Sequence, residues 1–460
     1  MYEYLQYSDL RLEASVTQLG EPPWTTVTVE KYITGMTSSK VKKPISLQHM
    51  NSWRLHRQFL DRPFPSKNIL DLIKSIGWLY SPGCSTPYLS LWARMPSFKA
   101  EDLNRPVFED RKLIQLETLR GCTMLVPRDQ AAVALRIRTR TFTELSKQAR
   151  QQMPVSEAEM EQLKLAILKS LQNGPRTAEQ LQQAAPASLI RDFSHDLKRI
   201  GFTNSLSLAI NLLKEEGKLI KLQSRKRLDS TIYSLVLTSS VLPEIDPFNL
   251  RIEEACAQLA AQYFRAESPA RVKDFAWWAG INVTDAMRAA AEVKPKLVPI
   301  SVEGTKDEFL MVEAELDEFL AFEPQESAIN FIPYRDTFLK GQREIVNRFV
   351  STEHADKPFS RWKGKLINDP LATIIQNGRV IGVWEWNEDD EEVDLLLFDP
   401  SIPKSVEKTV RKRAGELANF IRANLGEVRL QGLDYGPHQM TGIHDLKMFW
   451  GKGVQVDVRV

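Results

Sequence analysis

The stretch from Ser156 to Leu237 constrains the fold of this chain more than any other part of the sequence. Ser156 and Glu159 can form a capping box, and Gly217 is suited to end a helix. The spacing of apolar residues predicts a first helix that follows this capping box and ends at Asn173 and Gly174, two more helices over 178–183 and 205–216, and two strands over 218–222 and 230–237. This order predicts a winged helix, in which one helix can enter the major groove of DNA and the hairpin loop can reach its backbone.

Weaker copies of this pattern lie on both sides. The segment 212–220 is similar to 117–125, and two helices followed by two strands are predicted again between 271 and 313. Three copies of roughly 80 to 110 residues indicate a tandem array. Around the first copy we expect helices over 46–60 and 66–76, a loop over 80–87, a helical piece over 111–119 and a long basic helix over 128–151.

The last part of the chain changes character. Strands are predicted over 328–333, 379–386 and 393–398, an acidic hairpin loop over 388–392, and a helix over 405–423. We therefore expect an α+β fold with three tandem winged-helix units and a C-terminal β-rich domain built as a small barrel or sheet. The expected boundaries are an N-terminal extension at 1–43, units at 44–155, 156–243 and 244–325, and the last domain at 326–460.

The distribution of charge indicates a nucleic-acid partner more clearly than the net charge of +2 does. Residues 120–150 hold seven basic and two acidic residues, and 191–230 hold nine and five, which gives local charges of +5 and +4. Such segments can form a basic face for phosphates, although single charge runs are more often solvated helix faces. The candidate DNA-contacting residues are Arg54, Arg57, Arg94, Arg120, Arg128, Arg136, Arg138, Arg140, Arg225, Lys226 and Arg227.

Several classes of protein find no support in the sequence. Phosphate-binding glycine loops, dinucleotide-binding fingerprints, zinc-protease motifs and serine-hydrolase elbows are all missing, so we expect no nucleotide cofactor and no other cofactor. Three widely spaced cysteines fit neither a disulfide framework nor a metal site. No apolar stretch approaches the roughly 20 residues of a membrane span. We expect a cytoplasmic protein without bound metal, and the sequence leaves its oligomeric state open.

Five segments resemble a known family. The segment Arg120–Asp129 looks like the pattern RGTLHLVPxxD of certain bacterial tandem winged-helix proteins, and Tyr88–Arg94 resembles their preceding helix. Lys273–Gly280 is similar to their DFxWWxG signature, and 330–336 with 377–384 resembles their C-terminal sheet domain. This resemblance is to the AlkZ/YcaQ-like DNA glycosylases, which excise alkylated bases and unhook interstrand crosslinks. It spans roughly 46–423 and implies three winged helices and a β domain around a duplex DNA channel.

The resemblance also locates the catalytic positions and shows a departure there. The Gln-x-Gln signature of the family falls on Tyr80, Ser81 and Pro82, and the histidine of RGTLH is Met124 here. Glutamine amides can orient a water and stabilise positive charge on the sugar, which a proline side chain cannot do. Asp129 is a further catalytic candidate.

Two hypotheses follow. One is a DNA-binding glycosylase that hydrolyses the N-glycosidic bond of a modified purine, with any residual activity depending on Tyr80. The other is a non-catalytic DNA-binding protein that senses lesions or regulates transcription. The architecture favours the first hypothesis, and the loss of both glutamines favours the second. Trp277 and Trp278 could stack on bases, but their helical spacing favours a place in the core.

Overall fold

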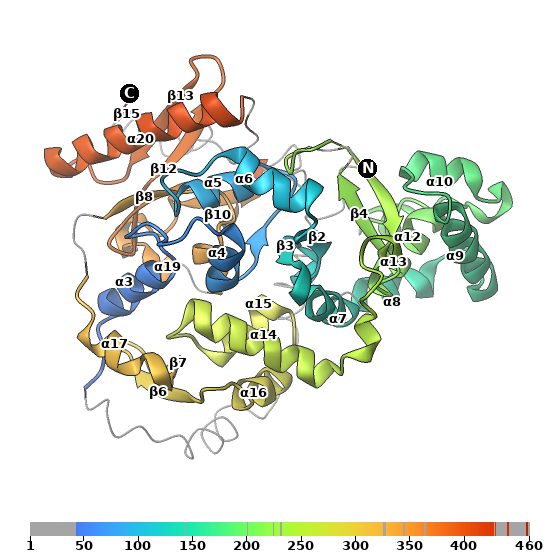
Figure 1. Ribbon diagram of the computed structural model, residues 1–460, viewed down its shortest axis with the longest axis horizontal. Helices are drawn as coiled ribbons and strands as arrows, with labels where there is room; N and C mark the ends of the chain where they lie inside the picture. The colour runs from blue at the N-terminus through green and yellow to red at the C-terminus, as the bar shows by residue number, and fades with distance from the viewer. Residues whose placement is uncertain are drawn as a thin grey trace.

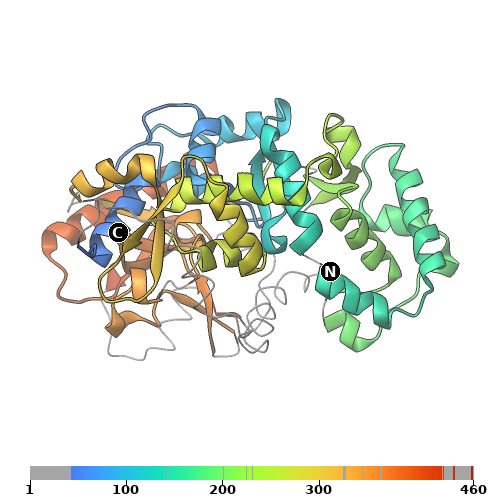
Figure 2. The same cartoon turned by 90° about the horizontal axis from the view of Figure 1, so that it is seen from below.

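The structure is a computed structural model. It describes residues 43–141, 143–199, 201–223, 225–230, 232–324, 328–343, 346–362, 365–426, 428, 439–440 and 457–458. The expected extension at 1–43 lies outside this part except for its last residue. The second unit forms a lobe at one end of the long axis, while the other units and the C-terminal sheets pack together at the other end (Figures 1 and 2).

The first unit opens with two helices and closes around a small antiparallel sheet of order β1-β3-β2. Ser46 caps the first helix, and Asn68 caps the second, which begins at Ile69 and not at residue 66 as predicted. The elements are α3 (Leu47–Arg57), α4 (Ile69–Ile76), β1 (Leu79–Tyr80), α5 (Thr86–Trp92), α6 (Ala100–Asn104), the π-helical turn η1 (Arg105–Glu109), β2 (Leu113–Glu117), the 3-10 turns η2 (Leu119–Gly121) and η3 (Arg128–Gln130), and β3 (Thr123–Pro127).

One local prediction in this unit is wrong. The segment 111–119 is not helical, because residues 113–117 pair as β2 with every residue of β3. That pairing is a contact between separate segments, and it overrides the local apolar spacing. Within the predicted basic helix over 128–151, residues 128–130 form the 3-10 turn η3, and the described residues that follow are helical, as α7 (Ala131–Thr141) and α8 (Thr143–Gln152).

The second unit follows its prediction closely. Capping boxes at Ser156 and Thr177 start the first two helices, and Gly217, with φ 67°, follows the last one. The elements are α9 (Glu157–Leu171), α10 (Ala178–Ala184), η4 (Ala187–Leu189), α11 (His195–Arg199), α12 (Ser205–Glu215), β4 (Leu219–Gln223) and β5 (Tyr233–Leu237). These helices enclose a leucine-rich core of their own, and β4 and β5 form an antiparallel hairpin.

The third unit contains a helix that the sequence prediction missed. This is α14 (Ile252–Glu267), which packs against α3, α4, α7 and α16. The predicted elements around it are confirmed as α15 (Val272–Ala279), α16 (Val283–Ala291), β6 (Leu297–Ser301) and β7 (Glu308–Val312). Shorter pieces flank them as α13 (Thr238–Val241), η5 (Pro247–Asn249), η6 (Glu313–Glu315) and α17 (Leu316–Ala321).

The C-terminal part is built on two sheets, with strand orders β15-β13-β12-β11-β8 and β10-β9-β14. Helix α20 (Lys404–Asn424) packs on the larger sheet, and the acidic loop is a hairpin turn that joins β12 to β13, as predicted. The strands are β8 (Ile329–Ile332), β9 (Phe359–Trp362), β10 (Lys365–Pro370), β11 (Thr373–Gln376), β12 (Arg379–Asn387), β13 (Glu392–Leu397), β14 (Gln439–Met440) and β15 (Asp457–Val458); the short helices are α18 (Thr337–Lys340), α19 (Val346–Phe349) and η7 (Thr352–His354).

The predicted α+β class is confirmed by this mixture of helices and several small sheets. The first unit and the C-terminal sheet share one hydrophobic core, in which Leu72 and Leu91 lie with Ile374 and Leu396. Residues far apart in sequence are thereby fixed beside one another. No helix of the described residues is long and apolar enough to cross a membrane.

Candidate active site

The family-motif positions Tyr80 and Ser81 lie on and just after an edge strand, not in the open loop expected from the sequence. Strand β1 pairs with β3, so that Tyr80 lies opposite Met124. The next residue continues the ladder, because the Ser81 amide donates to the Thr123 carbonyl at 2.8 Å. Both Tyr80 and Ser81 are 1% exposed, and Pro82 is half-buried.

The Tyr80 side chain turns into the core beside the third unit. It packs in the same apolar cluster as Met124 and Trp278. Its hydroxyl lies 3.5 Å from a guanidinium nitrogen of Arg120, and that guanidinium stacks 3.8 Å from the ring centre of Trp277. Arg120 itself has a positive φ of 48°. Three segments singled out by the sequence therefore meet at one place.

The two tryptophans of the family signature differ in their surroundings. Trp278 is 4% exposed and belongs to the core, in agreement with the sequence expectation. Trp277 is only half-buried, and two cations lie near its ring, Arg120 and the Lys340 ammonium 6.0 Å from the centroid. Trp277 thus packs against the edge of the same core and keeps part of its ring exposed.

Ser81 is hydrogen-bonded to one glutamine, which is bonded to a second, and the sequence analysis singled out neither of them. The Gln115 amide nitrogen donates to the Ser81 hydroxyl at 2.9 Å and to its carbonyl oxygen at 3.2 Å. The Gln223 amide nitrogen donates to the Gln115 side-chain oxygen at 3.1 Å. We call Gln115 and Gln223 the amide relay. The three residues come from β2, from β4 and from the end of β1, so no local sequence pattern connects them.

The segment 82–87, which follows the motif positions, is connected by hydrogen bonds to the buried carboxylate of Asp369. The Thr86 hydroxyl donates to the Tyr334 carbonyl oxygen at 2.7 Å, and the Tyr334 hydroxyl donates to Asp369. Asp369 is 5% exposed and also pairs with Arg335 and Lys340, at 3.2 Å each. The motif loop is thus tied to the C-terminal domain through a polar network.

Asp129, the other catalytic candidate, lies at the surface. Its side chain is 61% exposed and pairs with Lys74 at 2.5 Å. Together with Leu70 and Ile245 it lines a shallow surface pocket of about 520 Å³. Among the described residues, no hydrogen bond or ion pair joins it to residues 80–82.

Several candidate DNA-contacting arginines are buried. The prediction that their charges belong to an exposed basic face is therefore wrong for these residues. Arg54, Arg94 and Arg138 are at most 1% exposed, and Arg120 is 5% exposed. Their guanidinium groups contact protein side chains, and burial leaves no room for a phosphate beside the first three. Spacing along a helix does not reveal burial, so the sequence could not separate these residues from surface cations.

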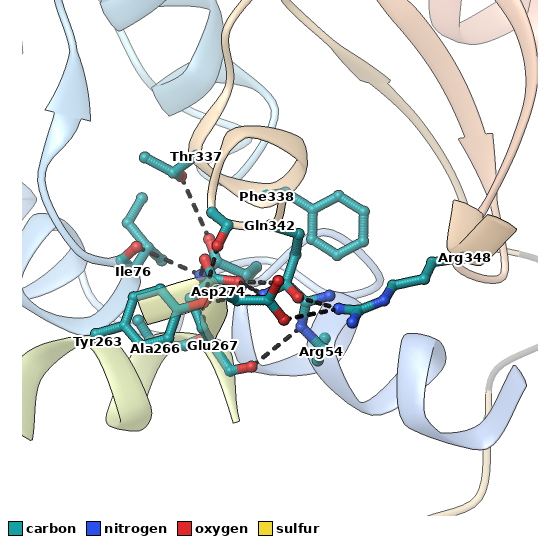
Figure 3. Close-up of polar contacts among 12 residues, drawn as sticks. Arg54, Ile76, Tyr263, Ala266, Glu267, Asp274, Thr337, Phe338, Gln342 and Arg348 are labelled. Atoms are coloured by element: carbon teal, nitrogen blue, oxygen red, sulfur yellow. Dashed lines mark hydrogen bonds and ion pairs between the residues drawn. The ribbon is translucent and has the colours of Figure 1, made fainter. Parts of the chain in front are cut away.

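Arg54 belongs to a polar cluster buried between α3, α14 and residues 337–348 (Figure 3). It forms an ion pair with Glu267, which also accepts hydrogen bonds from the amides of Gln342 and Gln58, each at 3.2 Å. Burial raises the pKa of Glu267 to about 7, although the Arg54 guanidinium opposes that shift. The cluster joins the first and third units to the C-terminal domain.

The remaining candidates lie nearer the surface. Arg57 pairs with Glu315 at 2.7 Å, Arg128 pairs with Glu244 at 2.8 Å, and Arg136 donates to the Leu250 carbonyl at 2.9 Å. In the hairpin loop of the second unit, Arg225 and Lys226 are exposed, whereas Arg227 is held by Asp229 and the Leu425 carbonyl. The Arg140 side chain lies outside the described residues.

A further carboxylate, Glu117, whose side chain is 11% exposed, joins the first two units and was not singled out by the sequence. It contacts Lys221, Lys214 and Arg138 at 2.7, 2.8 and 3.4 Å. Burial by itself raises the pKa of Glu117, but these three cations together hold it well below its usual value. Burial lowers the pKa of Lys214 to about 8.

We expect Glu117 to stabilise the protein in a pH-dependent way. Its folded-state pKa lies below the unfolded value, so its contribution is complete above about pH 4.5 and is lost as the pH falls further. Glu117→Gln is expected to lower the free energy of unfolding by about 3 kcal/mol at pH 7, because three buried cations lose their carboxylate. Denaturant titrations at pH 7 and pH 3.5 should show a smaller difference from wild type at the lower pH. An equal difference at both values contradicts the assignment.

No group of three or more metal-binding side chains comes together within the described ranges. The side chains around Tyr80–Pro82 offer hydroxyls, amides and a cation for chemistry.

Comparison with known proteins agrees with the resemblance of the individual segments. A family model described as DNA glycosylase AlkZ-like matches residues 74–420. The solved structure of Streptomyces sahachiroi DNA glycosylase AlkZ superimposes with a TM-score of 0.65 and 22% sequence identity, and the match covers 84% of this chain and 99% of that one. No curated protein matches the chain. The family model spans most of the sequence, including the motif strand and most of the C-terminal domain, and the chain therefore belongs to the AlkZ-like DNA glycosylase family.

Proposed function

We propose that this protein binds duplex DNA and hydrolyses the N-glycosidic bond of N-alkylated purines, a reaction that also releases one end of an interstrand crosslink between purines. Family membership supports a glycosylase-type role in DNA repair. One structural observation carries the proposal further. Three segments of the family pattern meet at one place, because Arg120 contacts both the Tyr80 hydroxyl and the Trp277 ring.

This chemistry suits a site built from hydroxyls, amides and cations. An alkylated purine carries a positive charge and leaves as a neutral base, so the leaving group needs little assistance. The protein has to hold the sugar, place a water beside its anomeric carbon and keep that geometry fixed. Polar side chains on rigid strands can do this without a metal or a nucleotide cofactor.

The proposed DNA surface includes the hairpin loop of the second unit. Arg225 and Lys226 project from a turn where a winged helix would touch the backbone. The domain boundaries drawn from the sequence and a cytoplasmic location belong to the same proposal. The free cysteines Cys84, Cys122 and Cys256 fit a reducing compartment.

A specific observation favours a second candidate, a DNA-binding protein without catalysis. Neither motif glutamine is present, the Tyr80 phenol is buried beside Arg120, and the Pro82 side chain has no donor or acceptor. Such a protein would sense lesions or regulate transcription. Under the first candidate, the same departures imply slow chemistry.

Base release from duplexes that contain N7-methylguanine tests the proposal. We expect measurable but slow release in single turnover, together with tight binding of the duplex. Loss of an oriented donor costs on the order of 10² to 10³ in rate, so the rate should lie far below that of a family member with both glutamines. Release no faster than the spontaneous loss, with binding retained, would favour the non-catalytic candidate. A crosslinked duplex in parallel tests unhooking.

A further inference from the structure

The amide relay ends in a polar atom that has no partner. The Gln223 side-chain oxygen is buried, and among the described residues it accepts no hydrogen bond. Buried polar atoms in folded proteins are nearly always paired with protein or with an ordered water. An amide oxygen left open at the end of a hydrogen-bonded series is therefore a place where a water would bind.

The orientation of each amide follows from chemistry, because the Ser81 backbone carbonyl can only accept a hydrogen bond. The nitrogen of Gln115 must therefore face Ser81, as observed, and its oxygen must face Gln223. Gln223 must therefore donate from its side-chain nitrogen to the Gln115 oxygen, which directs the Gln223 oxygen away from Gln115. The orientation of the Gln223 side-chain oxygen is thus determined by the Ser81 backbone carbonyl, through two successive hydrogen bonds.

The relay lies on the opposite face of the small sheet from Tyr80. Ile114 and Leu116 point into the same apolar cluster as Tyr80. Gln115 lies between them on β2 and so points to the other face, where Ser81 meets it. Two amides from β2 and β4 thereby gather at the middle position of the motif, while the phenol beside it faces the core.

We propose that the Gln223 side-chain oxygen holds the water that attacks the sugar during base excision, with Gln115 and Ser81 as positioning residues. This proposal rests on the proposed glycosylase function. The water oxygen forms a bond to C1′ while the C1′–N bond breaks. The bonding electrons leave with the base and neutralise its positive charge. The proton lost from the attacking water passes to bulk solvent, because an amide does not take it up.

An amide oxygen suits this step because it orients the water without titrating. It accepts one hydrogen bond and directs a lone pair of the water toward C1′. Gln223 is also the last residue of β4, directly before the exposed loop with Arg225 and Lys226. The water site is therefore assembled from the first and second units, next to the proposed phosphate contacts.

The test compares Gln223→Leu, Gln223→Glu and Tyr80→Phe with wild type, and Gln183→Leu is the matched control. Gln183 is an exposed amide on α10 of the same unit. Base release is measured from N7-methylguanine duplexes with enzyme in saturating excess. The dissociation constant for an uncleavable duplex and the melting temperature are measured for each variant.

We expect Gln223→Leu to release base at least 100-fold more slowly, with the dissociation constant changed less than threefold. Gln183→Leu should match wild type. Gln223→Glu can keep both hydrogen bonds only when its carboxyl is protonated. Its rate should therefore fall as the pH rises through the titration of that carboxyl, while the wild-type rate stays flat. A purely structural role of the relay predicts that affinity and melting temperature fall together with the rate.

The remaining outcomes are distinct. Unchanged release by Gln223→Leu, or complete loss in Tyr80→Phe alone, overturns the assignment of the water to Gln223 but leaves the glycosylase function in place. Wild-type release no faster than spontaneous loss overturns both proposals. A rate loss in Gln223→Leu that is matched by loss of affinity or of melting temperature overturns the catalytic assignment.

Discussion

Glu267→Leu is expected to lower the free energy of unfolding by about 3–5 kcal/mol, the largest stability loss that we expect from a single substitution in this chain. The change removes the carboxylate that pairs with Arg54 and leaves a guanidinium that is 0% exposed without its partner. It also removes the acceptor for the amides of Gln58 and Gln342. A buried charge that loses its partner retains the full cost of desolvation.

The ion pair itself should contribute little net stability. Burial raises the pKa of Glu267 to about 7 even beside Arg54, which shows how strongly desolvation opposes the charge. Replacing both partners, as in Arg54→Met with Glu267→Leu, should therefore recover most of the loss. Denaturant unfolding of the two single variants and the double variant measures this coupling. If the losses in the double variant simply add, the cluster does not act as a pair.

The second unit could be predicted from sequence because its signals are local. Ser156, Thr177 and Gly217 mark helix ends through contacts within one turn, and each of them does so in the structure. The hairpin that follows has residues of high strand propensity on both sides of a polar turn. Local chemistry and the final fold agree for these elements, although the short helix α11 and the turn η4 were not predicted.

The errors arise where contacts between distant segments decide the structure. Residues 113–117 form a strand because β3 is beside them, which no apolar spacing reveals. Helix α14 carries apolar residues at Leu259, Tyr263 and Phe264, a helical spacing that could have identified it. Its last residue, Glu267, then forms the centre of a cluster contributed by three parts of the chain.

For the candidate site, the sequence located the motif positions at 80–82 but predicted a loop there, whereas Tyr80 ends strand β1. Adjacent residues of a strand face opposite sides, so Tyr80 and Ser81 lie in different surroundings. Gln223 reaches Gln115, which in turn bonds Ser81, only because β2 and β4 lie side by side, and a single glutamine in a strand carries no signal of its own. The sequence could not show which arginines are exposed, because Arg94 is buried and Arg225 is exposed although both are the same residue type.

Affinity for duplex DNA is expected to fall about 100-fold between 50 and 200 mM salt, with little dependence on base sequence. Each phosphate contact releases a counterion, and about four contacts give a slope near −3.6 in log affinity against log salt. Arg57, Arg128, Arg225 and Lys226 are four of the candidates whose charges remain partly or fully exposed. Fluorescence anisotropy on duplexes of unrelated sequence measures the slope.

Removing the two loop cations should change this slope without unfolding the protein. Arg225→Ala with Lys226→Ala is expected to reduce its magnitude by about two, one unit for each lost phosphate contact. Both side chains are exposed, so stability should stay within about 0.5 kcal/mol of wild type. Arg227 is left in place because it holds Asp229 and the Leu425 carbonyl.

A matched loss of two exposed charges on α20, Lys408→Ala with Lys412→Ala, should leave the slope unchanged. If affinity is already absent at 50 mM salt, or does not change up to 200 mM, phosphate contacts do not drive binding. An equal effect of both double variants would indicate that net charge, and not the hairpin loop of the second unit, attracts the DNA. A lower slope in the loop variant alone places this loop at the backbone, next to the residues that hold the proposed attacking water.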